Sequence, residues 1–393
     1  MFSAQTIALI KATVPVLKQH GEAITTHFYQ LMLREHPELK AFFNEAHQAH
    51  GTQARALAGA VLAYAANIDR LEALAGALPR IIQKHVSLGV EAQHYPIVGQ
   101  CLLRAIKEVL GEAATDDIIA AWGEAYTALA NILIAAEEQV YQDNAAKLGG
   151  WRGTRAFKVA RKEPESELIT SFYLEPTNGG ALPAFQPGQY LTLVLKVHGQ
   201  EMRRNYSLSD APGKPWLRIS VKREAGGLAS NWLHDEVQVG QELQVQAPSG
   251  DFVLSEATTR PLVLVTGGVG ITPAMSMLEA NAASGRPIHF IHAARHGGVH
   301  AFRDRVDELA AQHANVRATY VYEQPRGAER PHTIGRVTQD LLGQHLPADR
   351  DVDVYFIGPK PFMQAIYQIG RDLGVQPSQL RYEFFGPMEA ITA

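Results

Sequence analysis

The stretch KHVSLGVE, which begins at Lys84, places one histidine, His85, near the end of an amphipathic helical pattern. An imidazole is a common ligand for metal ions and for haem iron. The chain contains 16 histidines, however, and a single histidine on a helix is usually an ordinary surface or core residue. His85 alone therefore does not indicate a site, and only other motifs in the chain can show whether it is a ligand.

A glycine-rich turn, TGGVGITP, holds Gly267, Gly268 and Gly270 between the apolar run 261–265 and a helix expected to start near residues 272–273. Backbone N–H groups at such a helix N-terminus suit a pyrophosphate, and glycines let it approach. Turns between strands and helices are also glycine-rich for purely steric reasons. The order is not the usual G-x-G-x-x-G, so the turn alone is a weak signal.

Two further polar motifs precede this turn. In Arg204-Asn205-Tyr206-Ser207, an arginine can pair with a phosphate, a tyrosine can lie against a flat ring, and a hydroxyl can bond to it. Further on, the basic run 222–224 leads to a glycine turn with Gly227 and Ser230, which could meet a second phosphate. Each motif could equally be an ordinary turn of a β-barrel.

The composition bounds the possible functions. A chain of 393 residues, 46% hydrophobic and 19% charged, predicts two or three soluble globular domains. The net charge of −4, without runs of like charge, does not favour nucleic acid or an anionic membrane as partner. One cysteine, Cys101, excludes an internal disulfide, a cysteine-based metal cluster and covalent c-type haem. Because neither a secretory signal nor an apolar run of 18 residues is found, we expect a cytoplasmic protein.

The pattern of apolar residues divides the chain into three parts. Residues 1–145 show the three- and four-residue spacing of an all-α domain, and the last helix is expected to run from Asp116 to about Asn144. Residues 151–257 contain short alternating runs, as expected for an antiparallel β-barrel. Residues 258–393 alternate strand, glycine turn and helix, which predicts a mostly parallel, doubly wound α/β sheet.

Taken in order after a barrel, R-x-Y-S, G-G-x-x-S, T-G-G-V-G-I-T-P and G-P-x-x-F-M resemble the motifs of the ferredoxin–NADP reductase family. The resemblance implies FAD on the barrel and NADH or NADPH on the parallel sheet, with a terminal aromatic, Phe385, covering the flavin. Three arginines, Arg295, Arg303 and Arg305, could meet a 2′-phosphate or be solvated. The implied FAD residues are Tyr190, Arg204, Asn205, Tyr206, Ser207, Gly227, Ser230, Phe384, Phe385, Gly386 and Pro387, and the implied nucleotide residues are Gly267, Gly268, Val269, Gly270, Ile271, Thr272, Pro273, Gly358 and Pro359.

The helical part resembles the globins. Pro37-Glu38-Leu39 precedes Phe42-Phe43, where globins place a phenylalanine, here Phe43, against haem, and His85 follows 42 residues later, where the proximal iron ligand belongs. The whole chain thus resembles the bacterial and fungal flavohaemoglobins, which implies a b-type haem. In that family Tyr95 and Glu137 match the partners of the proximal histidine, although the neighbouring Glu138 is easily mistaken for Glu137.

On the opposite side of the haem, the resemblance implies that Tyr29 donates a hydrogen bond to the oxygen substrate. It also implies that Tyr29 tunes the redox properties of the haem. Gln53 and Leu57, one helical turn apart, would complete the pocket. His47 and His50 are interpreted as solvated. Lys84 and Glu383 are candidate haem–flavin contacts that tune electron transfer.

The resemblance implies an NAD(P)H-dependent nitric oxide dioxygenase, an oxidoreductase that passes electrons through FAD to haem and converts NO and O₂ to nitrate, with reversible O₂ binding besides. No nucleic acid and no obligate protein partner are expected, and membrane lipid is possible but not indicated. Two alternatives remain: a flavin-dependent reductase of ferric complexes, quinones or hydroperoxides, and an O₂ or NO sensor or store, for which a dedicated electron supply would be unnecessary.

Overall fold

The computed structural model describes residues 2–43, 51–255, 258–386 and 391. Backbone contacts divide the chain into two compact units. The first is built on the helices up to Ala146 and includes Val194–Arg204, and the second contains most of Lys147–Phe385. Each unit is considered by itself below.

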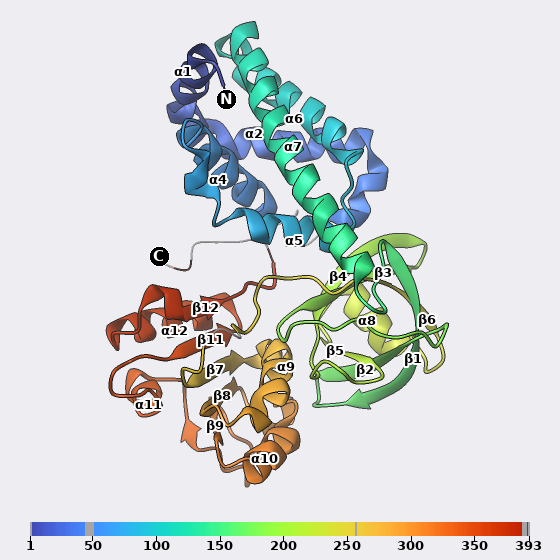
Figure 1. The fold of residues 1–393 in the computed structure, drawn as a ribbon, viewed down its shortest axis with the longest axis vertical. Helices are drawn as coiled ribbons and strands as arrows, with labels where there is room; N and C mark the ends of the chain where they lie inside the picture. Colours follow the sequence, from blue (N-terminus) through green and yellow to red (C-terminus); the bar gives the residue numbers. More distant parts are fainter. Residues whose placement is uncertain (1, 44–50, 256–257, 387–390, 392–393) are drawn as a thin grey trace. The chain divides into compact units, whose positions relative to one another are not determined.

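The first unit is helical, as the residue spacing predicts (Figure 1). The Pro37 ring ends one helix, because the preceding residue His36 leaves the α conformation. The longest helix, α7, is apolar and long enough to cross a membrane by length and composition, but it packs against α1, α5 and α6 of this unit. The α-helices are α1 (Ala4–Ala12), α2 (Val14–Glu35), α4 (Thr52–Ala66), α5 (Leu78–Leu88), α6 (His94–Leu110) and α7 (Asp116–Ala146), with 3-10 turns at Pro37–Phe42, Leu71–Leu74 and Gly111–Ala113.

The antiparallel strands form one six-stranded sheet in the order β4-β3-β6-β1-β2-β5. The sheet curls, because Leu208, directly after β4, bridges to Ile219 on β5 and so joins the two edge strands. The predicted barrel is therefore confirmed. Its strands are β1 (Thr154–Pro164), β2 (Ile169–Pro176), β3 (Tyr190–Val197), β4 (Gln200–Ser207), β5 (Leu217–Lys222) and β6 (Glu242–Gln246), and one short helix, α8 (Leu228–Asp235), follows β5.

The second sheet has the order β10-β9-β8-β7-β11-β12, and all five of its neighbouring strand pairs are parallel. The chain runs outward from β7 to β10 and then returns to the other side with β11, so the order reverses between β7 and β11. Ligands of doubly wound sheets bind at this reversal, beyond the carboxyl ends of the strands. The strands are β7 (Leu262–Gly267), β8 (Ile288–Ala294), β9 (Val316–Tyr322), β10 (Thr333–Ile334), β11 (Asp353–Ile357) and β12 (Leu380–Tyr382), and the α-helices are α9 (Ile271–Asn281), α10 (Arg303–Gln312), α11 (Gln339–Gly343) and α12 (Lys360–Asp372).

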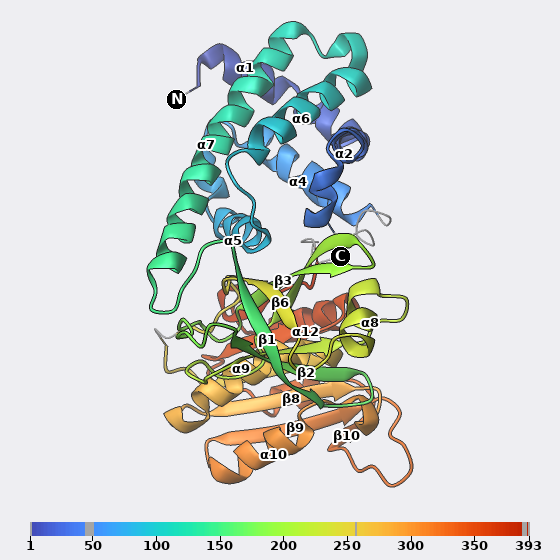
Figure 2. The ribbon, with the colours of Figure 1, turned by 90° about the vertical axis from the view of Figure 1, so that its right-hand side faces the viewer.

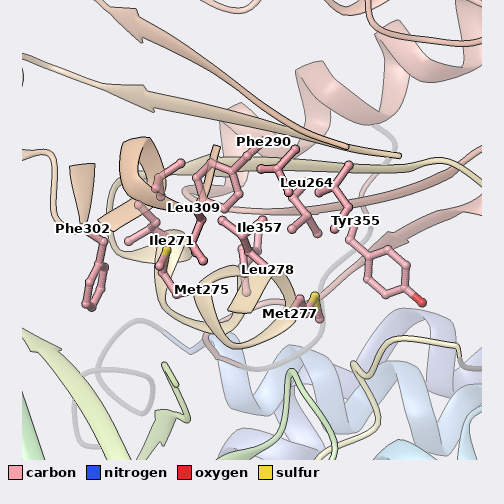
Figure 3. Close-up of a cluster of buried hydrophobic side chains, with 14 of the residues drawn as sticks. Leu264, Ile271, Met275, Met277, Leu278, Phe290, Phe302, Leu309, Tyr355 and Ile357 are labelled. Atoms are coloured by element: carbon pink, nitrogen blue, oxygen red, sulfur yellow. The ribbon is translucent and has the colours of Figure 1, made fainter. Parts of the chain in front are cut away.

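Alternating residues of the parallel strands face two separate apolar cores. Leu264 on β7 and Phe290 on β8 pack with residues of α9 and α10, whereas Val263 and Val265 pack with α11 and α12. The helices accordingly cover both faces of the sheet (Figures 1 and 2). In the first core, Leu264, Ile271, Leu278 and Phe290 interdigitate (Figure 3) and are fully buried.

This core generates a stability prediction. Replacing the fully buried Phe290 by alanine removes a large apolar side chain and leaves a cavity, so the free energy of unfolding of the second unit should fall by about 3–5 kcal/mol. Ile334 is a matched control, since it is 68% exposed and Ile334→Ala should change that free energy by less than about 0.5 kcal/mol. Equal losses in the two variants, measured by denaturant unfolding, would contradict the packing described above.

Candidate functional site

The structure brings His85, Tyr95 and Glu137 together in the first unit. His85 Nδ1 lies 2.7 Å from Glu137 Oε1 and 3.2 Å from the Tyr95 hydroxyl. The Tyr95 hydroxyl in turn donates to the same carboxylate oxygen at 2.6 Å. The carboxylate that reaches the histidine is Glu137, whereas Glu138 accepts a hydrogen bond from Gln142 one turn along α7. One carboxylate oxygen therefore organises the whole group.

Local sequence explains how three helices meet there. Helix α5 ends at Gly89, whose φ of 73° is the left-handed conformation that suits glycine, so His85 falls in the last turn. The Tyr141 hydroxyl on α7 then donates to the Val90 carbonyl at 2.7 Å and fixes the chain after the turn. On α6, Tyr95 lies in the first turn, and its carbonyl accepts from the Tyr126 hydroxyl of α7 at 2.6 Å. The end of α5 is thus tied to α7, which carries Glu137.

Burial fixes which atoms of His85, Tyr95 and Glu137 donate hydrogen bonds and which accept them. Glu137 is only 2% exposed, and burial together with the adjacent Glu137 raises the pKa of the Tyr95 hydroxyl far above its usual value. Tyr95 therefore stays a donor, and the carboxylate oxygen accepts hydrogen bonds from the Tyr95 hydroxyl and from the His85 Nδ1–H. With Nδ1 protonated, the His85 lone pair is on Nε2, which is the nitrogen of a histidine ligand to haem iron. The donor set fits a haem.

A second group lies in the main apolar cluster of the helices. Tyr29 on α2 is 8% exposed, packs edge-on against Phe43 with ring centres 5.6 Å apart, and is hydrogen-bonded to Gln53 of α4. Burial raises the pKa of the Tyr29 phenol well above its usual value, although the Gln53 bond opposes this shift. Leu57, one turn beyond Gln53, packs against the same cluster. The buried phenol is therefore kept as a hydrogen-bond donor among apolar side chains.

The predicted flavin residues lie on and beside the barrel. Tyr190 is 8% exposed and exchanges backbone hydrogen bonds with Ser249, and a Cβ on Gly250 would lie 2.9 Å from its ring. The Asn205 amide donates to the Thr192 hydroxyl at 2.7 Å. Because Gly250 has no side chain, the Tyr190 ring packs directly against its backbone and is held in place. These residues fit a flavin.

Hydrogen bonds and burial hold both the flavin motif and the glycine turn that follows β5 in place. Arg204 donates to the Arg203 carbonyl at 2.8 Å, and Ser207 at the end of β4 is buried. Gly227 precedes α8, where the Ser230 hydroxyl accepts from the Glu224 N–H at 3.1 Å. The remaining predicted residues in the described chain are Tyr206, which is partly buried, Phe384, which packs edge-on to Tyr382, Phe385, which is 49% exposed, and the half-buried Gly386.

The two predicted nucleotide motifs meet at the strand-order reversal. Gly267 ends β7, and a Cβ on Gly270 would lie 2.2 Å from the Ile357 carbonyl at the end of β11. A Cβ on Gly358 would lie 3.2 Å from Gly267 Cα. Because no side chain fits between these segments, the backbone of both strands' carboxyl ends approaches closely. Val269, Ile271, Thr272 and Pro273 complete the turn into α9, and Pro359 leads into α12.

The structure places the remaining sequence-predicted residues in both units. Lys84 is exposed on α5 and Glu383 is partly buried after β12, each in its own unit. Of the three arginines considered for a 2′-phosphate, Arg303 lies 3.8 Å from Asp307 and Arg305 bonds to Glu279 and Glu308, whereas Arg295 is exposed at the end of β8. His47, His50 and Pro387 lie outside the described residues.

Sequence reasoning missed two aromatic residues that shape these sites. Phe362 lies within 3.2 Å of the position that a Cβ on Gly267 would take, and closer still to that of Gly358. The phenylalanine of G-P-x-x-F-M was visible in the sequence and could have indicated it. Tyr126, which holds the Tyr95 carbonyl, shows no motif and becomes evident only when α6 and α7 are paired.

A helical unit with a carboxylate-bound histidine, fused to a barrel and a nucleotide-binding sheet, defines a globin joined to a flavin reductase. Family models agree: the Globin model matches residues 26–133, the oxidoreductase FAD-binding domain residues 156–254, and the oxidoreductase NAD-binding domain residues 264–368. The chain belongs to the flavohemoprotein family. It is 58% identical to the flavohemoprotein of Burkholderia sp. (strain TH2), and the match covers 100% of both chains.

Solved structures support the same grouping. A flavohemoglobin from Malassezia yamatoensis, described with bound FAD and heme, matches with a TM-score of 0.86 and 28% identity over 98% of this chain and 99% of that one. The FAD/NAD-binding domain of a nitric oxide dioxygenase from Vibrio cholerae matches with a TM-score of 0.56 and 35% identity, over 60% of this chain and 100% of that one. The fold class predicted from the sequence is therefore confirmed, and the flavohemoglobin match covers 98% of the chain.

The hydrogen bond from His85 to Glu137 gives a first test of the site. In Glu137→Gln the neutral amide no longer holds the Nδ1 proton by charge, so the haem affinity of the apoprotein should fall about 10- to 100-fold. The iron–histidine stretching frequency, measured by resonance Raman spectroscopy, should fall with it. Glu138→Gln is the matched control and should leave both values unchanged, and identical behaviour of the two variants would refute the assignment.

The raised pKa of Tyr29 gives a pH-dependent test. Above pH 10 an exposed phenol in the unfolded chain loses its proton, whereas the folded Tyr29 keeps it, so the folded state binds more protons and stability falls as pH rises. Below pH 10 the residue contributes no pH dependence. In Tyr29→Phe, the slope of unfolding free energy above pH 10 should be shallower by about 1.4 kcal/mol per pH unit. An unchanged slope in alkaline denaturation would show that the phenol ionises normally.

Proposed function

We propose that the protein is an NAD(P)H-dependent nitric oxide dioxygenase with three domains, residues 1–145 for haem, 151–257 for FAD and 258–393 for the nucleotide. The carrying observation is the hydrogen-bonded group of His85, Glu137 and Tyr95 in a chain that matches flavohemoproteins over its full length. When bound, the cofactors supply the redox chemistry: nicotinamide gives two electrons as a hydride to FAD, which passes them singly to a b-type haem where O₂ and NO combine to nitrate.

In this proposal the residues of the chain bind, orient and tune. His85 Nε2 would be the iron ligand, and Glu137 would raise its electron donation through Nδ1, with Tyr95 holding the carboxylate in place. Such a ligand would increase the electron density on the bound iron, which would favour chemistry at an oxygen substrate. Tyr29 and its neighbours would act on that substrate.

Tyr29 is proposed to stabilise negative charge that develops on the oxygen substrate. Its phenol is a neutral donor throughout the physiological pH range, it is fixed by Phe43 and Gln53, and it lies in an apolar cluster where hydrogen bonds to charge are strong. Leu57 and Phe43 would limit the space beside it and exclude water. Reversible O₂ binding would use the same donor.

The reductase residues are proposed to hold the two electron-carrying groups. Arg204, Asn205, Tyr206, Ser207 and the Gly227–Ser230 turn would bind FAD, with Tyr190 and the segment from Phe384 onward beside its ring system. The turn from Gly267 to Pro273, with Gly358 and Pro359, would bind the nucleotide at the strand-order reversal. Lys84 and Glu383 remain proposed modulators of electron transfer.

The substrates on this proposal are small molecules: O₂, NO, and NADH or NADPH. We propose no nucleic-acid ligand and no obligate protein partner, and a cytoplasmic location in which α7 serves as a core helix of the haem domain. The net charge of −4 agrees with this, because it offers no general attraction to polyanions.

The role of Tyr29 separates a dioxygenase from a reductase with a passive globin. Tyr29→Phe keeps the ring and removes the donor, so NADH-driven NO consumption under air should fall about a hundredfold. NADH oxidation by ferricyanide should stay unchanged in the same variant, because that reaction uses only the reductase. NO consumption that survives the substitution would favour the reductase alternative, and measuring both rates on one preparation gives the control.

A further inference from the structure

A cluster of buried charges joins the barrel to the helix that leaves the glycine turn, within the second unit. Arg218 Nη2 on β5 lies 3.5 Å from Glu279 Oε1 on α9, and the two side chains are only 8% and 5% exposed. Arg305 Nε on α10 donates to the same Glu279 oxygen at 3.1 Å. One buried carboxylate thus contacts an arginine of the barrel and an arginine of the nucleotide-binding domain.

Arg218 is itself fixed to the segment that follows the flavin motif. Its Nε donates to the Ser209 hydroxyl at 3.2 Å, and its Nη2 donates to the Ser209 carbonyl. Its Nη1 donates to the Tyr173 hydroxyl at 3.4 Å, and the guanidinium lies 4.9 Å from the centre of the Phe302 ring. Since Ser209 comes two residues after Ser207, the planar fork of Arg218 is tied to the chain leaving the flavin site.

Asp210 adds a second buried carboxylate to this cluster. It is 5% exposed, accepts from Trp216 Nε1 at 2.9 Å, and is hydrogen-bonded to Glu279. Burial disfavours its ionisation, but the Arg218 charge, the hydrogen bonds with Trp216 and Glu279 and the Lys214 charge together outweigh burial and lower the pKa of Asp210. Burial raises the pKa of Glu279, and the bonds from Arg305 oppose that shift. Two carboxyl groups at hydrogen-bonding distance therefore depend on the positive charge of Arg218 beside them.

The apolar contact between the barrel and the nucleotide-binding domain sets their relative orientation less strictly than the buried charges do. Ile169 of β2 and Phe252 belong to the same apolar cluster as Met277 of α9, and such burial stabilises contact without strong directional preference. Buried ion pairs behave differently. They add little net stability over apolar packing, but removing or displacing one partner leaves an uncompensated buried charge and is strongly destabilising. The charged cluster is therefore the part of the contact that fixes geometry.

We propose that Glu279, held between Arg218 and Arg305, is a positioning residue that sets the approach of the nicotinamide to the flavin. Helix α9 begins at the glycine turn and carries Glu279 near its other end, so anchoring Glu279 to the barrel fixes where the turn points. The cluster links the chain after the flavin motif to the helix after the nucleotide motif. This inference rests on the proposed electron path from NAD(P)H through FAD.

The test is anaerobic stopped-flow reduction of the flavin by NADH in the full-length holoprotein. In Glu279→Gln the limiting rate should fall tenfold or more, because a displacement of about 1 Å can cost up to about a hundredfold. The NADH concentration for half-saturation should change less than about twofold, because the glycine turn is intact. Glu279→Asp, which restores the charge, should recover part of the rate. Backbone amide exchange in 271–279 and 207–211 should become faster in Glu279→Gln.

Glu308→Gln is the matched control, because it removes the other, half-exposed carboxylate partner of Arg305 and leaves Glu279 in place. It should reduce its flavin at the wild-type rate. Wild-type limiting rate and exchange in Glu279→Gln, or an equal loss in Glu308→Gln, would overturn the inference. If wild-type flavin is not reduced by NADH at all, the proposed electron path fails instead, and unchanged amide exchange in Glu279→Gln would still overturn the positioning role.

Discussion

The hydrogen bonds from His85 and Tyr95 to one oxygen of Glu137 are the constraint on which the haem site depends. A buried carboxylate needs compensating donors, and these two side chains supply them from α5 and α6 to a residue of α7. The same bonds fix the tautomer of the histidine. Structure and chemistry are therefore coupled here: the interaction that makes a buried Glu137 tolerable also leaves Nε2 of His85 available to iron.

In the reductase part, glycines without side chains shape the proposed nucleotide site. At Gly270 and Gly358 a Cβ would collide with or crowd the backbone of the neighbouring segment, and at Gly267 it would crowd the side chains of Phe362 and Pro359. The carboxyl ends of β7 and β11 therefore approach without side chains between them. The start of α9 follows directly, and backbone N–H groups at a helix N-terminus suit a pyrophosphate. The proposed haem site depends on a buried charge, whereas the proposed nucleotide site depends on residues without side chains.

Much of this could be predicted from the sequence because the relevant signals are local. Helical spacing up to residue 145, alternation in the barrel and the β–turn–α rhythm after residue 258 each come from burial of one face of an element. The choice of Glu137 over Glu138 needed a family pattern, because both lie on one helix and only the packing of α5 against α7 distinguishes them. The Arg218–Glu279 pair could not be predicted, because it joins residues far apart in the chain with no motif around either.

The most direct measurement of the central claim is the yield of nitrate for each NADH consumed, in air-saturated solution with NO added to purified holoprotein. One NO and one O₂ together take up one electron to form one nitrate ion. Since NADH supplies two electrons, two nitrate ions should form for each NADH oxidised. That ratio requires electrons to pass from nucleotide through flavin to a haem held by His85. NADH oxidation that yields superoxide or hydrogen peroxide and no nitrate would contradict the account.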